Sequence, residues 1–414
     1  MDVSKFIATR SFSSFRKSFT RSIIRLSIGA TSLSLAVMII SQSIFNGFQK
    51  EIANKVFGFW GHIHITDVQS SRSIEPVTIQ APRELLDSMR SIRLPGSNDP
   101  AIRHLQAFMV YPGIAGYKEE FEGLFAKGVG PDFDWDFFNR FLVKGRVQTA
   151  PDSPFNKSIL ISEITANRLK ADTGQYLLLN FIVNDELLKR RLKISGIYNT
   201  GLAEYDRRFA LLDIRLIQQL LKKGPDEATG IEIFCQDILL AGPVNDYLYD
   251  QYLPVEWYSE TIREKFPNIF EWLSLQDVNK SFILFLILAV CIINMATTVM
   301  ILILERTQMI GVLTVLGMPR WTQRMIFLRF AARILGWSML LGNLAGIGLC
   351  WLQYHFKWIR LSETDYYLSY APIDLSLTPV LLLNLIFFLV IILSLILPTW
   401  IVQSVKPIQA LRFR

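Results

Sequence analysis

The chain has 414 residues, of which 51% are hydrophobic and 19% are charged, and its formal net charge is +7. Several uncharged stretches are long enough to cross a bilayer, which excludes a wholly soluble protein. The excess of basic residues lies beside those stretches rather than in one basic domain, which argues against a nucleic-acid-binding protein.

Residues 1–25 carry six basic residues against one acidic residue, with phenylalanines spaced among serine and threonine. This pattern is typical of a basic amphipathic helix on the inner leaflet, and a plain basic lead-in to a membrane span is the alternative. The stretch at 26–49 is uncharged, and apolar residues beyond it continue at steps of three or four as far as Phe59. We therefore expect one helix that crosses the membrane and continues as a stalk, rather than a signal peptide cleaved near Ser43.

The region 61–254 changes to short alternating stretches typical of strands, with helical patterns between them. Strands are predicted within 62–66, 157–162, 176–183, 191–198 and 230–235, and helices at 82–93, 162–171 and 213–222. We expect an α+β domain with a division near residues 151–154, where two prolines enclose an Asp-Ser pair. His62 and His64 alternate along the first strand, where a polar strand face is favoured over a metal site.

Three further spans are predicted. The 23 residues from Phe282 to Leu304 carry no charge and follow a second stalk, and the stretches at 334–356 and 375–405 are also uncharged. Pro398 lies near one boundary of the last stretch.

Polar and small residues inside the spans predict contacts between helices. The polar exceptions are Asn294, Asn343 and Asn384, for which interhelical hydrogen bonds are favoured over a path for a transported solute. Gly342 and Gly346 are four residues apart, a spacing that permits a close helix contact in the third span.

Between the second and third spans, a charged collar precedes a short amphipathic helix. One apolar stripe at helical spacing is formed by Met309, Val312, Leu313 and Leu316. Gly317 can adopt the left-handed conformation that ends a helix, and Pro319 prevents its continuation. The stripe is too short to span the bilayer and too apolar to face water, so we expect a groove on a partner protein to bury it.

The charge distribution predicts the topology. Basic residues are in excess at 1–25, 305–333 and 406–414, whereas the loop at 354–377 has two basic and three acidic residues. The positive-inside rule therefore places both termini and the loop after the second span in the cytoplasm. The large domain and the loop between the last two spans are then outside.

Three stretches resemble the MacB/FtsX superfamily of ABC-transporter permeases, and most closely its lipoprotein-releasing (LolC/LolE) branch. They read "ILERTQMIGVLTVLGMPRWTQRMIFL", "NGFQKEIANKVFGFWGHIHIT" and "FPNIFEWLSLQDVNKSFIL". The resemblance implies a multi-pass protein of the inner membrane with four transmembrane helices. A MacB-like α+β periplasmic domain is inserted between the first two of them.

The resemblance also implies a function. Such a permease subunit couples ATP hydrolysis by a separate LolD-like ABC ATPase dimer to the extraction of lipoproteins from the outer leaflet, for delivery to the outer membrane. ATP and Mg²⁺ bind to that ATPase, and this chain has neither a nucleotide-binding motif, nor a bound cofactor, nor a catalytic residue. Its further implied partners are a second copy or a related permease subunit, the lipoprotein, membrane lipid and a periplasmic lipoprotein carrier. A MacB-like efflux permease and an FtsX-like signalling subunit that activates a cell-wall hydrolase are the alternatives.

Two groups of site residues follow from the resemblance. The ATPase-coupling residues are Glu305, Arg306, Met309, Ile310, Gly311, Val312, Leu313, Leu316, Gly317, Met318 and Pro319. The first two spans line a lipid cavity, to which we assign Phe45, Phe48, Phe282 and Phe285. One departure from the branch is the short connection at 184–189, which lacks the longer carrier-holding loop and argues against carrier capture by this subunit.

The predicted division of the chain is an amphipathic segment at 1–25, the first span and stalk at 26–60, the extracytoplasmic domain at 61–254, the second stalk and span at 255–304, the coupling helix at 305–326, the third span at 327–356, an outer loop at 357–374, the fourth span at 375–405 and a tail at 406–414.

Overall fold

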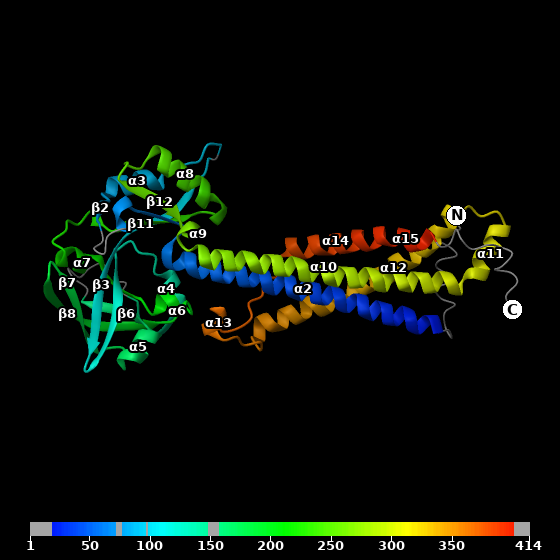
Figure 1. Ribbon diagram of the computed structural model, residues 1–414, viewed down its shortest axis with the longest axis horizontal. Helices are drawn as coiled ribbons and strands as arrows, with labels where there is room; N and C mark the ends of the chain where they lie inside the picture. The colour runs from blue at the N-terminus through cyan, green and yellow to red at the C-terminus, as the bar shows by residue number, and fades with distance from the viewer. Residues whose placement is uncertain (1–18, 72–76, 97, 148–156, 401–414) are drawn as a thin grey trace. The chain divides into compact units, whose positions relative to one another are not determined.

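The computed structural model describes residues 19–71, 77–96, 98–147 and 157–400, and Figure 1 shows its elements. The chain divides into two compact units. The first unit comprises Met1–Lys50, Trp272–Arg360 and Tyr370–Arg414, and the second comprises Glu51–Glu271 and Leu361–Ser369. Most of the predicted amino-terminal amphipathic segment and the whole predicted tail lie outside the described residues.

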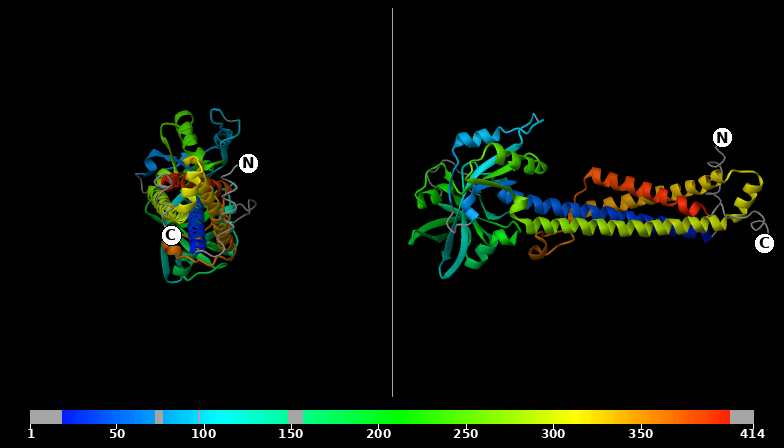
Figure 2. Two further views of the ribbon diagram at one scale, coloured as in Figure 1. Left: turned by 90° about the vertical axis from the view of Figure 1, so that its right-hand side faces the viewer. Right: turned by 45° about the horizontal axis from the view of Figure 1, so that its top comes forward.

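The first unit consists of long helices, and α2 and α10 run side by side in it (Figure 2). Its elements are α2 (Phe19–Trp60), α10 (Pro267–Glu305), α11 (Thr307–Val315), α12 (Arg320–Phe356), α14 (Leu377–Ser394) and α15 (Ile396–Thr399). Four segments are long and apolar enough to cross a membrane, namely Arg21–Trp60, Pro267–Glu305, Arg320–Phe356 and Leu377–Thr399. The described residues thus contain the four predicted spans, and α2 continues unbroken into the second unit as the predicted stalk.

The last span is interrupted where the sequence predicted one stretch at 375–405. Helix α14 ends at Ser394 and α15 begins at Ile396, with Pro398 inside α15. A proline has no amide hydrogen, and its ring clashes with the carbonyl four residues earlier, which here is that of Ser394. The regular helix therefore stops one turn before the proline, and residues 401–405 lie outside the described part of the chain.

Two glycines set the packing of α12 against α2. A Cβ atom on Gly342 would lie 2.8 Å from the carbonyl oxygen of Ser32, and one on Gly346 would lie 3.1 Å from the Cα atom of Ala36. Only glycine allows the two backbones to approach this closely. The predicted close contact of the third span is confirmed.

The polar residues inside the spans pair with each other. Asn343 Nδ2 donates to Asn384 Oδ1 at 2.7 Å and Asn384 Nδ2 donates back to Asn343 Oδ1 at 2.9 Å, which joins α12 to α14. Asn294 Nδ2 donates to Thr31 Oγ1 at 3.3 Å, which joins α10 to α2. These bonds confirm the predicted interhelical hydrogen bonding.

The second unit is built on a ten-stranded sheet. Its strands are β1 (Ile63–Asp67), β3 (Ile102–Tyr117), β4 (Glu120–Val129), β5 (Leu142–Gly145), β6 (Ser158–Ser162), β7 (Tyr176–Val183), β8 (Glu186–Tyr198), β9 (Phe209–Asp213), β11 (Gly230–Cys235) and β12 (Trp257–Thr261). A separate small sheet pairs β2 (Ile79–Gln80) with β10 (Glu227–Ala228).

The order of the large sheet is β12-β1-β11-β3-β4-β9-β6-β8-β5, and β7 pairs with both β3 and β8. The pairs β3–β4, β4–β9, β9–β6, β6–β8, β8–β7 and β7–β3 form a closed ring of six strands. Closure satisfies the hydrogen-bonding groups that an edge strand would expose.

Short helices alternate with the strands along the chain, which confirms the predicted α+β composition. They are α3 (Arg83–Arg90), α4 (Asp136–Arg140), α5 (Glu163–Leu169), α6 (Ala203–Asp206), α7 (Ile214–Leu220), α8 (Ala241–Gln251), α9 (Ile262–Lys265) and α13 (Glu363–Tyr366), with 3-10 turns η1 (Val68–Ser71) and η2 (Ile238–Leu240).

Two hydrophobic clusters among the described residues of the second unit meet at a boundary that differs from the predicted division near 151–154. One core uses residues between Met109 and Leu220, and the other uses residues on both sides of that range. Strand β3 contributes Leu105 to one core and Met109 to the other, because a single 16-residue strand is long enough to serve both. The six-strand ring is therefore an insertion into the other subdomain.

Candidate functional site

The coupling segment, residues 305–326, links α10 to α12 through the short helix α11. Gly317 has a φ angle of +81°, and the amide of Met318 donates to the carbonyl of Leu313 at 3.0 Å. Pro319 then occupies the position before α12 begins. A left-handed glycine followed by proline is a stop signal for a helix, so the predicted end of this helix is confirmed.

The inward face of α11 corrects the single exposed stripe that was predicted. Met309 and Leu313 are half-buried and pack against the core of the first unit, together with Met318. Ile310 and Gly311 lie between them and are buried. These residues therefore contribute to the core of the first unit.

The outward face of α11 carries the remaining apolar residues. Val312, Val315 and Leu316 are 47%, 66% and 76% exposed. Helical periodicity shows that apolar residues gather on one side, but it does not show which part of that side faces the same chain. The predicted stripe is therefore divided between two faces of α11, and Val315 lies with Val312 and Leu316 on the exposed one.

Gln323, at the start of α12, holds the coupling turn in place. Its buried side chain donates from Nε2 to Met318 O at 3.0 Å and to Thr314 Oγ1 at 3.1 Å. These bonds fix both the end of α11 and the turn after it to α12. Sequence reasoning did not single out Gln323, although a lone amide between a proline and an apolar run is a usable signal.

The charged residues of the coupling segment differ in exposure. Glu305 is exposed and Arg306 is half-buried. Arg324 is buried, and its guanidinium carbon lies 5.5 Å from the centre of the Trp400 ring. A cation over an indole face is a favourable contact that offsets part of the cost of burial.

The four phenylalanines assigned to a lipid cavity lie on α2 and α10. Phe45 and Phe48 are half-buried, and the rings of Phe48 and Trp272 are 5.7 Å apart. Phe282 and Phe285 are exposed on α10. Their apolar, accessible surface is suited to an acyl chain or to the apolar side of a second subunit.

Polar contacts join α2 to α10 next to these phenylalanines. Gln49 Nε2 donates to Asp277 Oδ2, and Lys280 Nζ donates to Asp277 Oδ1 at 2.6 Å and to Asn46 Oδ1 at 3.3 Å. Helix α2 is therefore joined to α10 twice, directly from Gln49 to Asp277 and from Asn46 to Lys280, which in turn contacts Asp277. Sequence reasoning missed this contact because its members are far apart in the chain.

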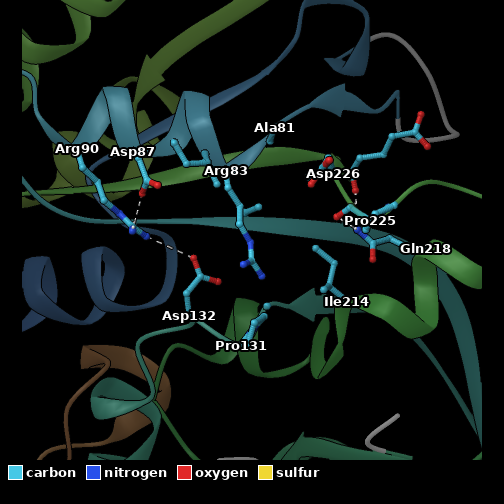
Figure 3. Close-up of a pocket in the computed structure, with 15 residues that line it drawn as sticks. Ala81, Arg83, Asp87, Arg90, Pro131, Asp132, Ile214, Gln218, Pro225 and Asp226 are labelled. Carbon is cyan, nitrogen blue, oxygen red and sulfur yellow. Dashed lines mark hydrogen bonds and ion pairs between the residues drawn. The ribbon is translucent and has the colours of Figure 1, made fainter. Parts of the chain in front are cut away.

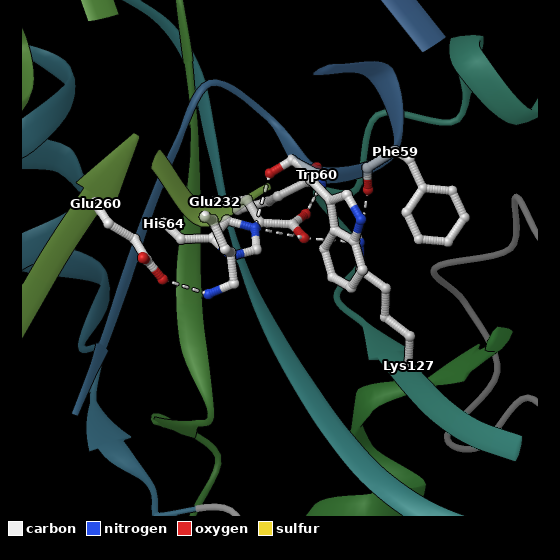
Figure 4. A network of polar contacts seen from close by, with 8 residues as sticks. Phe59, Trp60, His64, Lys127, Glu232 and Glu260 are labelled. Carbon is white, nitrogen blue, oxygen red and sulfur yellow. Dashed lines mark hydrogen bonds and ion pairs between the residues drawn. The ribbon is translucent and has the colours of Figure 1, made fainter. Parts of the chain in front are cut away.

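The carboxyl end of α2 enters a network that we call the stalk joint, formed by Phe59, Trp60, His64, Lys127 and Glu232 (Figure 4). Lys127 Nζ donates to the carbonyl of Phe59 at 2.8 Å, and His64 Nε2 donates to the carbonyl of Trp60 at 2.9 Å. The last carbonyls of a helix lack partners within it and carry partial negative charge, so basic groups stabilise them.

An ion pair positions the lysine of the stalk joint. Lys127 Nζ lies 2.7 Å from Glu232 Oε1, and both side chains are fully buried. Gln106 Nε2 donates to Glu232 Oε2 at 2.8 Å. The strands β1, β11, β3 and β4, which are successive neighbours in the sheet, thus each contribute one side chain. Glu232 is the one charge of β11, whereas β4 carries Glu120 and Glu122 as well as Lys127, so only the glutamate stands out in the sequence.

Burial controls the protonation of the stalk joint. Burial lowers the pKa of His64 to about 4, so the imidazole is neutral and Nε2 carries its proton toward Trp60. Burial acts to raise the pKa of Glu232, but Lys127 and His64 outweigh it and hold the pKa below its ordinary value. The buried carboxylate is therefore ionised at neutral pH. His64 thus faces polar side chains of the neighbouring strands, as the predicted polar strand face requires, and that face is buried.

A cavity of about 370 Å³ lies in the second unit, and its lining comes from α3, α7 and the loops beside them (Figure 3). Arg90 forms ion pairs with Asp87 at 3.2 Å and with Asp132 at 3.6 Å along its wall. Gln218 Nε2 donates to Pro225 O at 3.0 Å. An acyl chain requires apolar walls, so this charged cavity is not suited to a lipid.

Comparison with known proteins identifies similar chains. Residues 281–407 match the family model described as FtsX-like permease C-terminal. The lipoprotein-releasing system transmembrane protein LolC of Xylella fastidiosa is 21% identical over 418 aligned residues, which cover 96% of this chain and 95% of that protein. The protein LolE of the same system from Haemophilus influenzae is 20% identical, with 92% of each chain covered. These matches confirm the resemblance that the motifs predicted.

Among solved structures, the periplasmic region of MacB from Actinobacillus actinomycetemcomitans matches 50% of this chain and 91% of its own length. It is 12% identical, with a TM-score of 0.35.

Proposed function

Because this chain carries an FtsX-like permease domain and resembles LolC and LolE along nearly its whole length, we propose that it is the membrane subunit of a lipoprotein-releasing ABC transporter. It lies in the inner membrane, with both termini in the cytoplasm and the second unit in the periplasm. A separate ATPase dimer binds ATP and Mg²⁺, and a second permease subunit completes the complex. The cargo is a lipoprotein extracted from the outer leaflet.

The observation that carries this proposal is the exposed apolar face of α11. Val312, Val315 and Leu316 occupy positions i, i+3 and i+4 and leave their side chains unburied. Burial of such a side chain in a groove contributes about 1.5–3 kcal/mol before ordering costs. A rigid helix that exposes three such residues at the cytoplasmic boundary is suited to docking on the ATPase.

Force from the docked helix has a continuous route to the second unit. Helix α10 leads directly into the coupling segment, and Gln323 fixes that segment to α12. The contacts around Asp277 join α10 to α2. Helix α2 ends in the stalk joint, where Lys127 of β4 and His64 of β1 donate to its last carbonyls. Each step is a packed or hydrogen-bonded contact within one unit, or a continuous helix.

The experiment replaces Leu316 with Asp and measures recovery of the ATPase with the tagged permease in mild detergent. A charge in the docking groove has no partner, so we expect recovery to fall at least tenfold while membrane insertion is unchanged. Leu316→Met is the control that keeps an apolar side chain. Val255→Asp is the matched control on an apolar residue of the second unit that is 94% exposed, and it should leave recovery intact.

Two results would contradict the docking assignment. Equal recovery with wild type and Leu316→Asp would show that α11 does not bind the ATPase. Equal loss in Leu316→Asp and Val255→Asp would show a general effect of added charge. Leu313→Asp does not test the contact, because Leu313 packs against the core of its own unit.

The cargo is tested separately, by identifying molecules that co-purify with the complex and are lost on ATP addition. Lipidated proteins are expected. Recovery of drugs or unlipidated peptides would favour a MacB-like efflux permease. Binding of a cell-wall hydrolase without any cargo would favour an FtsX-like signalling subunit.

The carrier contact is assigned to the partner permease subunit. Strands β7 and β8 are joined by a two-residue turn, in which Asn184 and Asp185 have φ angles of +48° and +63°. Two successive positive φ angles are typical of the tightest hairpin connections. The hairpin of this chain therefore offers no protruding loop with which to hold a carrier.

A further inference from the structure

The loop between α12 and α14 contains a segment that belongs to the second unit. Residues Leu361–Ser369, with the short helix α13, cluster with Glu51–Glu271, whereas Arg360 and Tyr370 on either side belong to the first unit. The loop closes on itself, since the amide of Leu361 donates to the carbonyl of Ser369 at 3.0 Å. The sequence predicted only an outer loop at 357–374.

A lysine of the stalk holds this segment by its backbone. Lys55 lies on α2, five residues before the helix ends, and its side chain is buried. Its Nζ atom donates to the carbonyl oxygen of Tyr367 at 2.8 Å and lies 5.2 Å from the centre of the Phe141 ring. A buried ammonium group without partners is costly, so this geometry indicates a fixed contact and not a passing one.

The segment makes two further contacts with the second unit. Asn199 Nδ2 donates to Glu363 Oε2 at 3.3 Å and to Glu163 Oε2 at 2.9 Å, so one amide bridges the loop to helix α5. Gly201 has a φ angle of +75°, and a Cβ atom there would lie 2.8 Å from Lys55 Nζ and 3.0 Å from Tyr367 O. Glycine is required at this approach for both reasons.

The loop of the second unit that contacts the segment, residues 199–201, is held in place by hydrogen bonds to Asp206. Asp206 accepts a hydrogen bond from the Thr200 hydroxyl at 2.7 Å, from the Thr200 amide at 3.0 Å and from the Gly201 amide at 3.1 Å. Leu368 of the segment is buried. The loop of the second unit is therefore preorganised to receive the segment. On the segment's side, the buried Leu368 side chain excludes water from the contact.

We propose that Lys55, Asn199 and Gly201 form a clasp that keeps residues 361–369 attached to the second unit throughout the transport cycle. The clasp gives the second unit a connection to α12 and α14, in addition to α2 and α10. Because α12 begins at the end of the coupling turn, movement there reaches the second unit by this third route. This inference rests on the proposed function, and part of its test does not depend on that function.

The first experiment opens the clasp with Lys55→Met in the full complex. Hydrogen exchange of residues 361–369 should rise at least tenfold, because the Tyr367 carbonyl loses its donor. ATP hydrolysis should stay within about twofold of wild type, whereas lipoprotein release should fall at least tenfold. Lys50→Met is the matched control, since Lys50 is on the same helix, is 62% exposed and forms an ion pair with Asp374 at 3.5 Å.

The second experiment closes the clasp chemically. Asn199→Cys and Glu363→Cys, in a chain whose three native cysteines are replaced by alanine, are joined with a short reducible bis-methanethiosulfonate linker. The linked protein should release lipoprotein at the wild-type rate, and the linker should restore release to Lys55→Met. Rescue by the linker distinguishes a positional role from a general effect on folding.

Three outcomes would overturn the clasp. Unchanged hydrogen exchange in Lys55→Met would show that Lys55 does not hold the segment, whatever the transporter carries. Loss of release on linking, with recovery on reduction, would show that the segment must detach. Normal release by Lys55→Met would show that the connection bears no force. If wild type releases no lipoprotein at all, the proposed function fails, and the hydrogen-exchange result still decides whether the clasp exists.

Discussion

The coupling segment exposes apolar side chains, whereas the stalk joint buries charged ones. Helix α11 leaves Val315 and Leu316 exposed, whereas the stalk joint buries Lys127 and Glu232 completely. Apolar residues are ordinarily inside and charged residues outside. In the proposed function a second protein covers the exposed apolar face, whereas the buried charges are paired within the chain. A contact made with a partner and a contact made within the chain would then differ in where their polarity lies.

The largest expected effect comes from breaking the stalk joint with Lys127→Met. The substitution leaves Glu232 buried without its cation, a change that typically costs about 3–5 kcal/mol. Denaturant unfolding of the purified protein in detergent should show that loss. The matched control is Lys170→Met, because Lys170 forms an exposed ion pair with Glu120 and should cost less than about 1 kcal/mol. Equal losses in the two variants would contradict the self-contained joint.

A double substitution sharpens the same comparison. Lys127→Met combined with Glu232→Gln removes both charges, and the double variant should recover part of the stability that Lys127→Met loses. A double variant less stable than Lys127→Met would show that Glu232 contributes independently of the lysine.

The next effect is a pH dependence to which His64 of the stalk joint contributes, and to which His62, whose pKa burial also lowers to about 4, contributes in the same direction. The pKa of His64 is about 4 in the folded protein because of burial, below its ordinary value of 6.5. Between these values the unfolded chain binds a proton that the folded protein does not. Stability is therefore complete above pH 6.5 and is lost as the pH falls toward 4, by up to about 3 kcal/mol. His64→Gln keeps a donor for Trp60 and should lose less stability over that range.

The comparison with His64→Gln is needed because another group acts in the opposite direction. Burial raises the pKa of Asp206 to about 6, from an ordinary value of 3.8. The folded protein binds a proton there first, so this group adds stability as the pH falls from 6. It is present in both proteins and cancels in their difference. A difference between the two proteins that does not change with pH would exclude the assigned role of His64.

The sequence predicted features that depend on local pattern. The continuity of α2, the helix end at Gly317 and the close contact at Gly342 all follow from hydropathy, backbone freedom and spacing. These properties involve residues within a few turns of each other. They are therefore readable without knowing which distant segments meet.

Features that depend on distant pairs were not predicted. The closed ring of six strands, the ion pair of Lys127 with Glu232 and the hold of Lys55 on the Tyr367 carbonyl each join residues far apart in the chain. The exposure of α11 failed for a related reason. Periodicity defined an apolar side, but packing on α12 decided that Leu313 faces inward and Leu316 outward. Pattern gives the faces of an element, and tertiary structure chooses their partners.

Truncating the two faces of α11 tests whether they differ in function. Leu313→Ala removes a half-buried side chain and should destabilise the first unit by about 2 kcal/mol. Leu316→Ala removes an exposed one and should change stability by less than about 0.5 kcal/mol. Binding of the ATPase should respond in the reverse order, with the larger loss for Leu316→Ala. Thermal unfolding and ATPase pull-down on the same preparations measure both, and the same order in the two assays would contradict separate faces.

The smallest expected effect concerns the amide of Gln323 in the coupling segment. This buried polar side chain makes the segment resemble the stalk joint at this one position. Gln323→Leu keeps the volume of the side chain but removes its hydrogen bonds to Met318 O and Thr314 Oγ1. An unmet buried carbonyl costs about 1–3 kcal/mol, and the added apolar contacts of leucine offset part of that. We expect a net loss near 1 kcal/mol, with faster hydrogen exchange confined to residues 313–319.

ATPase recovery should stay high, because Val312, Val315 and Leu316 remain on the helix. Stimulated ATP turnover should nevertheless fall, because the turn is no longer fixed to α12. Normal turnover with faster exchange would show that the amide stabilises the turn without taking part in coupling.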